Sequence, residues 1–238
     1  MKVTEPKLRV LEIFCGTKSF SVQCELERGW EVTTLDNEPK FNPDILCDIM
    51  DWDYKNFPVP DVFWAGVPCT RYSMASFKRR PDLGNILALK TLEILEHFKK
   101  QNPNLKYGLE NPWSSLLKKQ DFMIGIPYVV CDYCAYGFPY KKRTMIFGNI
   151  KWSGRLCGGP GVCPAMIGNI HICTAQQGRQ TLARAPLQQE TWTREELYRM
   201  PPALCRELVN AIATQVSDNS LPSELQSAGI AEVSLDGL

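Results

Sequence analysis

The sequence has little histidine, no long hydrophobic run and no apolar leader. Only His97 and His171 are histidines among its 238 residues, so a Ser-His-Asp or Cys-His arrangement in the centre of a sheet is not expected. No apolar stretch reaches the roughly 18 residues that a membrane-spanning helix needs, and the start, MKVTEPKLRV, lacks the apolar segment of a secretion signal. These absences predict an intracellular protein with no membrane partner.

The composition is that of a folded domain rich in cysteine. Apolar residues make up 44% of the chain and charged residues 22%, which allows a full core and excludes disorder throughout. Ten cysteines would suit a disulfide framework in a small secreted chain. Here they lie mostly within apolar segments of a larger chain, which favours reduced thiols, a metal site or catalysis.

The net charge of +1 conceals an acidic end. Ser217–Leu238 contains four acidic residues and no Lys or Arg, so over positions 1–216 27 basic residues stand against 22 acidic residues, a net +5. The basic residues form short clusters at 78–80, 99–100, 118–119 and 141–143. Such clusters permit a polyanionic partner, although charge runs are more often solvated surface. We expect residues 217–238 to be a disordered acidic tail.

Apolar runs and breakers alternate along the chain in the order of an α/β protein. Helices are predicted from Ser19 to Arg28, from Ile86 to Phe98 and from Pro202 to Gln215. Strands are predicted at 8–14, 31–36, 44–49, 61–67, 106–109, 127–133 and 144–147. This alternation predicts a doubly wound, mostly parallel sheet. The main domain would span residues 1–149, followed by a small insertion at 150–192 and C-terminal helices at 193–216 that complete it.

The first strand, turn and helix have the layout of a nucleotide-binding βαβ unit. Cys15-Gly16-Thr17 breaks the first strand, and the second strand ends in Asp36, some twenty residues after Gly16. An acid at that position holds ribose hydroxyls in such units. The alternative is that Asp36 only caps the end of its strand.

A thiol and a carboxylate follow the ends of two later strands. Pro68-Cys69 ends one apolar run, and Glu110-Asn111-Pro112 ends the next. Because chemistry gathers beyond the carboxyl ends of strands in an open α/β sheet, Cys69 and Glu110 are expected in one crevice. Without a histidine, the thiol would have to be activated by nearby positive charge or by attack concerted with proton transfer. The alternative is an ordinary buried cysteine.

Several short motifs together resemble the cytosine-C5 DNA methyltransferases. In order and approximate spacing these are Phe14-Cys15-Gly16, Asp36, Asp48-Ile49, Pro68-Cys69, Glu110-Asn111 and Tyr136-Gly137-Phe138-Pro139. The resemblance covers about residues 8–150 and, faintly, 199–204. The Gly-Thr-Lys-Ser turn, the Glu-Asn-Pro motif and the short length are most similar to the compact enzymes of bacteriophages and other viruses.

The resemblance implies a Rossmann-like S-adenosylmethionine-dependent methyltransferase fold and a role for each matched residue. Cys69 would add to C6 of a flipped cytosine while Glu110 acts at N3, with Pro68, Asn111, Lys142 and Arg143 supporting them. The expected cofactor contacts are Phe14, Gly16, Thr17, Asp36, Asn37, Asp48 and Ile49. DNA phosphates would meet Arg71, Ser73, Lys78, Arg79, Arg80 and Lys141. The protein would act as a monomer, in a bacterial cytoplasm or in a host cell or nucleus.

The sequence departs from the family pattern in two places where the substrate is expected to bind. A glutamine and two arginines usually follow the Tyr-Gly-x-Pro turn, and this chain has Tyr140, Lys142 and Thr144 there. Only about fifty residues separate the last strand from the C-terminal helix region, so the target-recognition region at 150–192 is reduced. We therefore predict short or relaxed sequence specificity.

The insertion contains four soft metal ligands. Cys157, Cys163, His171 and Cys173 lie among glycines and prolines and suggest a structural zinc loop, against the alternative of unpaired cysteines. Cys131 and Cys134 are interpreted as packing residues, because side chains three apart on a strand point to opposite faces.

Three other functions stay open at this point. The same chemistry could act on RNA, because neither the sheet nor the mechanism would differ. A catalytically weak nucleic-acid-binding homologue fits the missing arginines. A nucleotide-dependent α/β enzyme without a nucleic-acid partner would explain Asp36 but leaves Glu110 and the basic loop unused.

Overall fold

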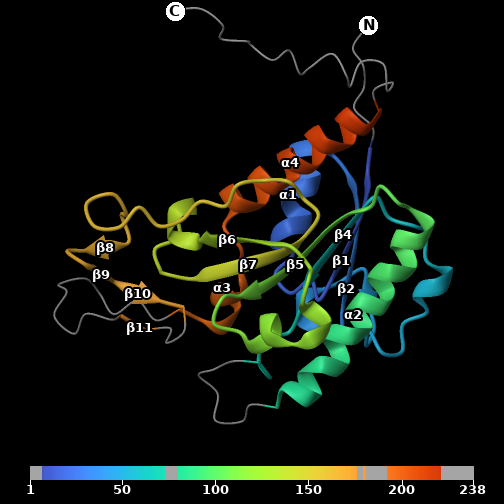
Figure 1. Ribbon diagram of the computed structural model, residues 1–238, viewed down its shortest axis with the longest axis horizontal. Coiled ribbons are helices and arrows are strands. Elements are labelled where there is room, and N and C mark those ends of the chain that lie inside the picture. Colours follow the sequence, from blue (N-terminus) through green and yellow to red (C-terminus); the bar gives the residue numbers. More distant parts are fainter. Residues whose placement is uncertain (1–6, 73–79, 176–178, 181–191, 221–238) are drawn as a thin grey trace, which may run out of the picture.

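A seven-stranded sheet forms the centre of the computed structural model (Figure 1), which describes residues 7–72, 80–175, 179–180 and 192–220. Its strand order is β3-β2-β1-β4-β5-β7-β6. Strands β1 to β5 pair in parallel, and β7 runs antiparallel to both of its neighbours. The strands are β1 (Arg9–Ile13), β2 (Glu31–Asp36), β3 (Ile45–Leu46), β4 (Val62–Gly66), β5 (Lys106–Pro112), β6 (Tyr128–Asp132) and β7 (Arg143–Gly148). The predicted Rossmann-like, doubly wound sheet is confirmed.

Helices cover both faces of this sheet (Figure 1). The helices α1 (Ser19–Arg28) and α4 (Pro202–Ser220) pack on one face, and α2 (Pro81–Gln101) packs on the other. A short helix, α3 (Arg194–Tyr198), precedes α4. Single 3₁₀ turns fill several connections: η1 (Pro39–Phe41), η2 (Tyr54–Asn56), η3 (Leu116–Lys119), η4 (Asp121–Met123) and η5 (Tyr133–Tyr136). No helix in the described part of the chain is both long and apolar enough to cross a membrane.

The alternation of side chains along the strands divides the core in two. On β4, Val62 and Trp64 face α1 and α4, whereas Phe63 faces α2, because successive side chains of a strand point to opposite faces. Trp64 stacks on Phe20 of α1 with ring centroids 4.1 Å apart. Both faces of the central strands are therefore buried away from solvent, as is usual for a parallel sheet.

Most predicted elements are present, with differences at their ends. Helix α1 and strand β2 have the predicted bounds, and α1 ends at Gly29 in the left-handed conformation. Strand β3 is only two residues long, and α2 is longer than predicted at both ends. Strand β5 continues through Pro112, so Glu110 lies within the strand. Helix α4 continues to Ser220, which corrects the predicted start of the tail at Ser217; residues 221–238 lie outside the described part.

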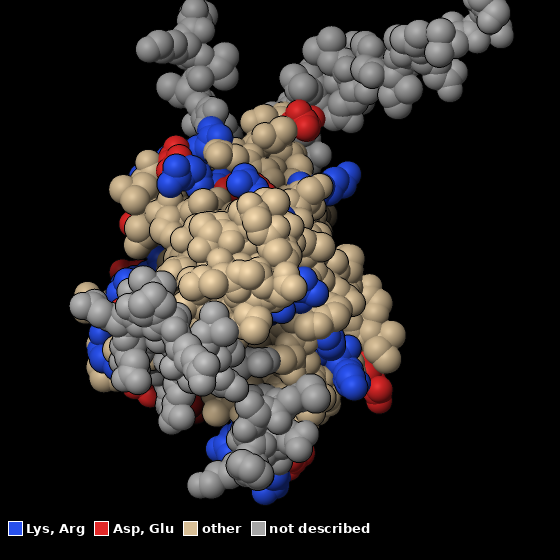
Figure 2. Space-filling model, turned by 90° about the vertical axis from the view of Figure 1, so that its left-hand side faces the viewer, with Lys and Arg blue, Asp and Glu red and all other residues tan. Residues whose placement is uncertain are grey.

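The insertion forms two small antiparallel sheets next to the β6 and β7 side of the main sheet (Figure 1). They contain β8 (Met166–Ile167), β9 (Ile170–His171), β10 (Cys173–Thr174) and β11 (Arg179–Gln180). The segment is joined to the main sheet by Lys141, whose N–H donates to the Cys173 carbonyl and whose own carbonyl accepts from the Ala175 N–H. Charged residues are absent from 156–178, and Figure 2, which views this side, shows a broad area of the described surface without Lys, Arg, Asp or Glu.

Candidate active site

A cleft of about 250 Å³ lies at the carboxyl ends of β1, β2, β4 and β5. Connections from β1 and β4 leave toward opposite edges of the sheet here, and ligands bind at such switch points in doubly wound folds. The lining includes most of the predicted site: Phe14, Gly16, Thr17, Asp36, Asn37, Pro68, Cys69, Glu110 and Lys142. A second hollow, of about 300 Å³, lies near the opposite end of β5 and is lined by none of the predicted site residues.

The turn after β1 is held in an uncommon backbone conformation. Phe14, Gly16 and Lys18 all have a positive φ, at 52°, 46° and 54°, and a bulky residue such as Phe14 occupies that region only under constraint. The Asp36 carboxylate accepts hydrogen bonds from the Gly16 and Glu38 backbone N–H groups, at 2.9 and 3.0 Å. The β2 acid thus fixes the turn while lining the cleft.

Cys69 and Glu110 face the same cleft from neighbouring strands. Gly66, the last residue of β4, pairs with Glu110 in the sheet register, and Cys69 follows three residues later. Burial raises the pKa of the Cys69 thiol, the Glu110 carboxylate raises it further, and Lys142 lowers it. The thiol is therefore not activated by its protein surroundings alone.

Two side chains hold the Glu110 carboxylate. The Tyr133 hydroxyl donates to its Oε1 at 3.1 Å, and the Lys142 Nζ lies 3.8 Å from the same oxygen. Burial and the Glu110 charge raise the pKa of Tyr133 well above its ordinary value, so the phenol keeps the proton that it donates. Lys142 also donates to the Leu197 carbonyl at 3.1 Å, which connects the site to α3.

Asn111 fixes the segment that leads to Cys69. Its side-chain nitrogen donates to the Val67 carbonyl at 2.8 Å, two residues before Cys69. The Asn111 Oδ1 is buried and has no hydrogen-bond partner within the described residues. The contact that Asn111 makes with the catalytic segment is therefore the one through its side-chain nitrogen.

The three altered positions are separated by the structure. Lys142 lines the cleft, whereas Tyr140 is buried beside Phe138 and Trp192 and donates to the Glu196 carbonyl. Thr144 is also fully buried. Of the three, only Lys142 reaches Glu110.

Arg143 points away from the cleft. It forms a two-point pair with Asp132, with both N···O distances at 2.8 Å. Burial raises the pKa of Asp132, but the hydrogen bonds from Arg143 and the Cys157 N–H outweigh it and hold that pKa below its ordinary value. The role predicted for Arg143 in support of Cys69 and Glu110 therefore has no support in this geometry.

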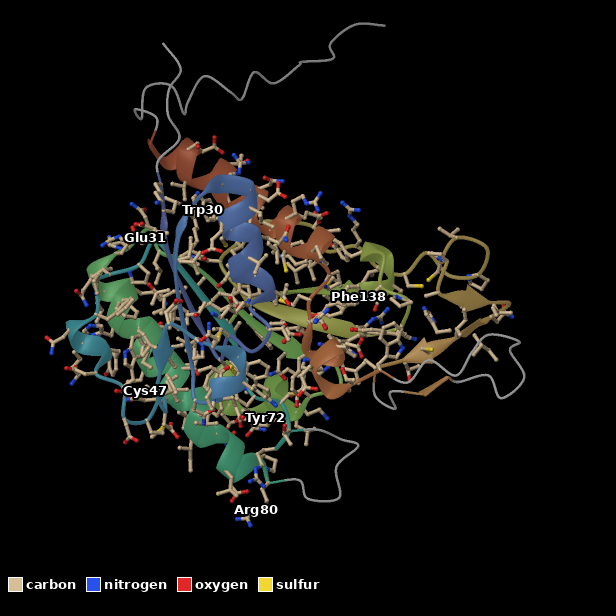
Figure 3. All side chains as sticks on the ribbon, turned by 180° about the vertical axis from the view of Figure 1, so that it is seen from behind. Trp30, Glu31, Cys47, Tyr72, Arg80 and Phe138 are labelled. Carbon is tan, nitrogen blue, oxygen red and sulfur yellow. The ribbon has the colours of Figure 1, made fainter. Side chains whose placement is uncertain are left out.

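The predicted DNA contacts are placed in part. Arg71, Arg80 and Lys141 are exposed, and Arg80 is paired with Asp82 at 2.8 Å. Figure 3 shows Arg80 at the edge of the molecule and Tyr72 closer to its body. Ser73, Lys78 and Arg79 lie outside the described residues.

Asp48 and Ile49 do not line the cleft. Asp48 is exposed and accepts a hydrogen bond from the Met50 N–H, and Ile49 is part of the core under α2. Their predicted contact with the cofactor is not supported by the shape of this cleft.

Glu12 is among the cleft residues that the sequence interpretation missed. It lies on β1 with only 4% of its surface exposed and accepts from the backbone N–H and hydroxyl of Ser21. Burial raises its pKa to about 7, although the Ser21 hydrogen bonds and Lys18 oppose the shift. The sequence feature that could have indicated Glu12 is its position as an acidic residue inside the apolar run LRVLEIF.

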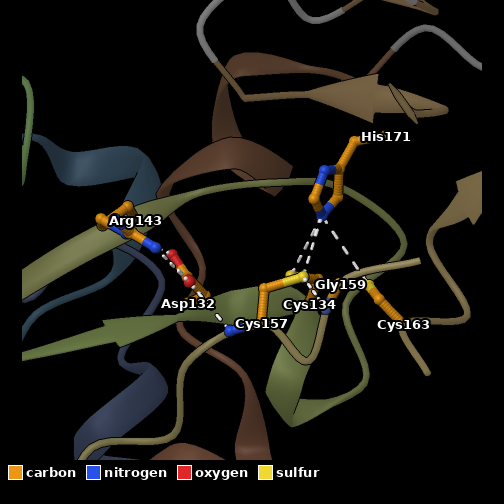
Figure 4. Close-up of polar contacts among 7 residues, drawn as sticks. All are labelled: Asp132, Cys134, Arg143, Cys157, Gly159, Cys163 and His171. Carbon is orange, nitrogen blue, oxygen red and sulfur yellow. Dashed lines mark hydrogen bonds and ion pairs between the residues drawn. The ribbon is translucent and has the colours of Figure 1, made fainter. Parts of the chain in front are cut away.

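The structure also corrects the predicted metal ligands. Within the described residues, the ligand atoms of Cys134, Cys157, Cys163 and His171 lie within 4.8 Å of one another, and Cys173 is not a member (Figure 4). A bend at Ile172 separates His171 on β9 from Cys173 on β10, so the two do not share a face. Cys134 was interpreted as packing on a strand, but β6 ends at Asp132 and Cys134 lies in η5.

The chain is similar to a known protein over most of its length. No model of a known protein family matches the chain. The chain is similar to a curated protein of Frog virus 3 (isolate Goorha) named "Probable DNA (cytosine-5)-methyltransferase". The two are 30% identical over 228 aligned residues, which cover 85% of this chain and 99% of the relative.

Proposed function

Because the chain belongs to the DNA (cytosine-5)-methyltransferase family, in its viral type, we propose that it transfers a methyl group from S-adenosylmethionine to C5 of cytosine in DNA. The observation that carries this proposal is the single cleft that contains Cys69, Glu110 and Asp36. A nucleotide-dependent enzyme without a nucleic-acid substrate would need Asp36, but it would need neither the Cys69 thiol nor the Glu110 carboxyl.

The residues of the cleft fit the proposed cofactor. The Asp36 carboxylate at the end of β2 suits ribose hydroxyls, while Phe14, Gly16 and Thr17 surround the space beside it, with Asn37 next to Asp36. Gly66 keeps this space open, because a Cβ there would lie 3.1 Å from the Phe14 carbonyl oxygen. When bound, S-adenosylmethionine supplies the electrophilic methyl group.

Cys69 and Glu110 then act at different atoms of the cytosine ring to activate it. The Cys69 thiolate adds to C6 while Glu110 hydrogen-bonds or protonates N3, so the ring electrons move to C5 and make it nucleophilic. After the methyl group is transferred to C5, loss of the C5 proton restores the C5–C6 double bond and expels the thiolate. Because burial and Glu110 raise the pKa of Cys69, we propose that the thiol loses its proton to water as the bond to C6 forms.

Glu110 is supported by Lys142, which stands where the family usually has an arginine, and by Tyr133. The Tyr133 hydroxyl and the Lys142 ammonium both lie at Oε1 of Glu110. This leaves Oε2 of Glu110 to contact the cytosine. Asn111 orients the segment before Cys69 through the Val67 carbonyl. These contacts favour an active enzyme over a silent binding homologue.

The proposed substrate is a cytosine flipped out of duplex DNA, because C6 is otherwise stacked within the helix. Arg71 and Lys141 are exposed and available for phosphates, together with the predicted loop residues. We assign residues 1–149 and the C-terminal helices to catalysis and 150–192 to a reduced target-recognition region. The protein is proposed to act as a monomer within a host cell, with short or relaxed specificity.

Trapping of the covalent adduct tests this function. The full-length protein is incubated with S-adenosylmethionine and duplex DNA in which 5-fluorocytosine replaces cytosine, so that the final proton loss is blocked. We expect a protein–DNA adduct that withstands denaturation, and its loss in Cys69→Ser. The same oligonucleotide as RNA is the comparison, and Cys47→Ser, at a half-buried thiol outside the cleft, is the matched control.

Methyl transfer that survives Cys69→Ser would sink the covalent mechanism. An adduct with RNA but not with DNA would overturn the proposed substrate. Absence of both methyl transfer and adduct in the wild-type protein would favour the silent homologue.

A further inference from the structure

We propose that Cys134, Cys157, Cys163 and His171 bind one structural zinc ion that fastens the insertion to the catalytic sheet (Figure 4). Three thiolates and one imidazole are a donor set that selects zinc in proteins. The four residues come from three separate segments: η5, the chain around residues 157–163, and β9. Their convergence is therefore a product of the fold rather than of sequence proximity.

The distances match a tetrahedral ion better than a set of hydrogen bonds. The His171 Nε2 lies 3.5 Å from the Cys134 Sγ, 3.4 Å from the Cys157 Sγ and 3.7 Å from the Cys163 Sγ. With Zn–S of about 2.3 Å and Zn–N of about 2.0 Å, a tetrahedral ion sets nitrogen and sulfur about 3.5 Å apart. One ring nitrogen has a single direction for hydrogen bonding and cannot serve three thiols, whereas an ion between the four atoms serves all of them.

The surroundings of Cys157 suit a thiolate ligand. The Gly159 N–H donates to the Cys157 Sγ at 3.4 Å, and the Cys157 N–H donates to the Asp132 carboxylate at 2.9 Å. Asp132 is itself held by Arg143 of β7. This chain of contacts orients a ligand from the insertion against two strands of the main sheet, as outer-shell contacts do in zinc sites.

The position of Cys134 connects the metal to the active site. Cys134 follows Tyr133, whose hydroxyl donates to Glu110. The Tyr133 N–H also donates to the Lys142 carbonyl, so η5 is bonded to the segment that carries the second partner of Glu110. An ion bound through Cys134 would therefore stabilise the turn from which Tyr133 reaches the catalytic carboxyl.

Few apolar contacts order residues 156–170 of the insertion without a metal, whereas segments on either side of them pack against the main core. Cys134, Cys163 and Ala165 form a small core of their own, with Cys157 and Met166 packed against it. Leu156, Val162, Ile167 and Ile170 are all largely exposed. A small segment with so little buried surface gains its order from a bound metal in comparable cases.

Metal content of the purified full-length protein tests the proposal without reference to methyl transfer. After expression with added zinc and dialysis, mass spectrometry should find about one zinc per chain in the wild type. Cys134→Ser should lose most of it, whereas Cys173→Ser, at the buried cysteine outside the cluster, should keep it. His171→Cys should also keep it, because a fourth thiolate replaces the imidazole, and His171→Ala should not.

Cobalt substitution covers the case in which Cys134→Ser fails to fold. Replacing zinc by cobalt in the wild type should produce a sulfur-to-cobalt charge-transfer band of three thiolates, and His171→Cys should raise its intensity by about a third. Wild-type protein that takes up neither metal overturns the proposal. Equal zinc loss in Cys173→Ser and Cys134→Ser overturns the ligand set.

Discussion

Two opposite charges, on Glu110 and Lys142, act on the Cys69 thiol. The pKa of this thiol therefore reports whether both charges act on it. Burial and Glu110 raise the pKa of the thiol, and Lys142 lowers it. A thiol reacts as its thiolate, so alkylation of Cys69 should rise with pH through the alkaline range and level off only above the raised pKa. The rate rises with pH because the thiolate is the reactive form, and burial moves the midpoint of that rise to higher pH.

Two substitutions should move this pH profile in opposite directions. Lys142→Met removes the cation and should shift the midpoint to higher pH, whereas Glu110→Gln removes the anion and should shift it to lower pH. The measurement is the rate of iodoacetamide labelling of the Cys69 peptide against pH. The midpoint reports the pKa, while altered access to the thiol changes only the plateau.

Lys141→Met is the control for this experiment, because Lys141 is exposed and does not line the cleft. It should leave the midpoint unchanged. A shift to lower pH in Lys142→Met would show that the lysine does not act on the thiol through its charge.

At the scale of elements, the first turn of α2 supports the segment that follows Cys69. Tyr72 is fully buried, its N–H donates to the Cys69 carbonyl at 2.9 Å and its hydroxyl donates to Asn85 of α2 at 2.8 Å. Gly84 leaves room for the Tyr72 ring, since a Cβ there would lie 2.8 Å from the ring Cζ and 3.1 Å from the Arg71 Cβ. The helix and the catalytic segment therefore share one close contact.

Gly84→Ala should destabilise the protein although alanine is the better helix former. The gain of up to about 1 kcal/mol in helix propensity is outweighed by overpacking, which costs about 1–3 kcal/mol. We expect a lower free energy of unfolding in urea and a lower yield of the 5-fluorocytosine adduct. Leu89→Ala, at an exposed position of the same helix, is the control.

The double variant Tyr72→Leu with Gly84→Ala should be less destabilised than the sum of the two single variants, because the smaller side chain makes room. Strict additivity would mean that the contact between Gly84 and Tyr72 is not the cause.

Elements with strong local signals were predictable, and contacts between distant elements were not. Gly29 marks the end of α1 because it adopts the left-handed conformation, and EVTTLD gave the bounds of β2. Cys134 was misassigned because the strand before it ends two residues earlier and a 3₁₀ turn redirects its side chain. The pairing of Tyr133 with Glu110 joins residues 23 apart across the sheet, and no local pattern indicates it.

For the whole molecule, the sequence predicts the topology and the shared cleft because strand ends of a doubly wound sheet meet at one place. Cys69, Glu110 and Asp36 are brought together from three strands by that rule alone. Arg143 shows the limit of such reasoning: the resemblance placed it in support of the catalytic residues, and in the structure it pairs with Asp132.

The C-terminal residues of the chain are acidic, whereas the rest of the chain has a net positive charge. Residues 221–238 contain Glu224, Glu232 and Asp236 and no basic residue, so removing them would raise the formal net charge from +1 to +4. Because a polyanion responds to net charge over about a Debye length, the shortened protein should bind non-specific duplex DNA more tightly at low salt. We expect a gain of roughly three- to tenfold at about 50 mM salt that shrinks toward none at about 200 mM.

Fluorescence anisotropy with a labelled duplex measures this effect. The full-length variant Glu224→Gln, Glu232→Gln, Asp236→Asn has the same net charge as the truncation and should reproduce its gain, which separates charge from chain length. Equal affinities of the wild type and both variants at low salt would mean that these acids do not oppose DNA binding. A gain in the truncation alone would assign the effect to steric exclusion by the segment, since only the truncation shortens the chain.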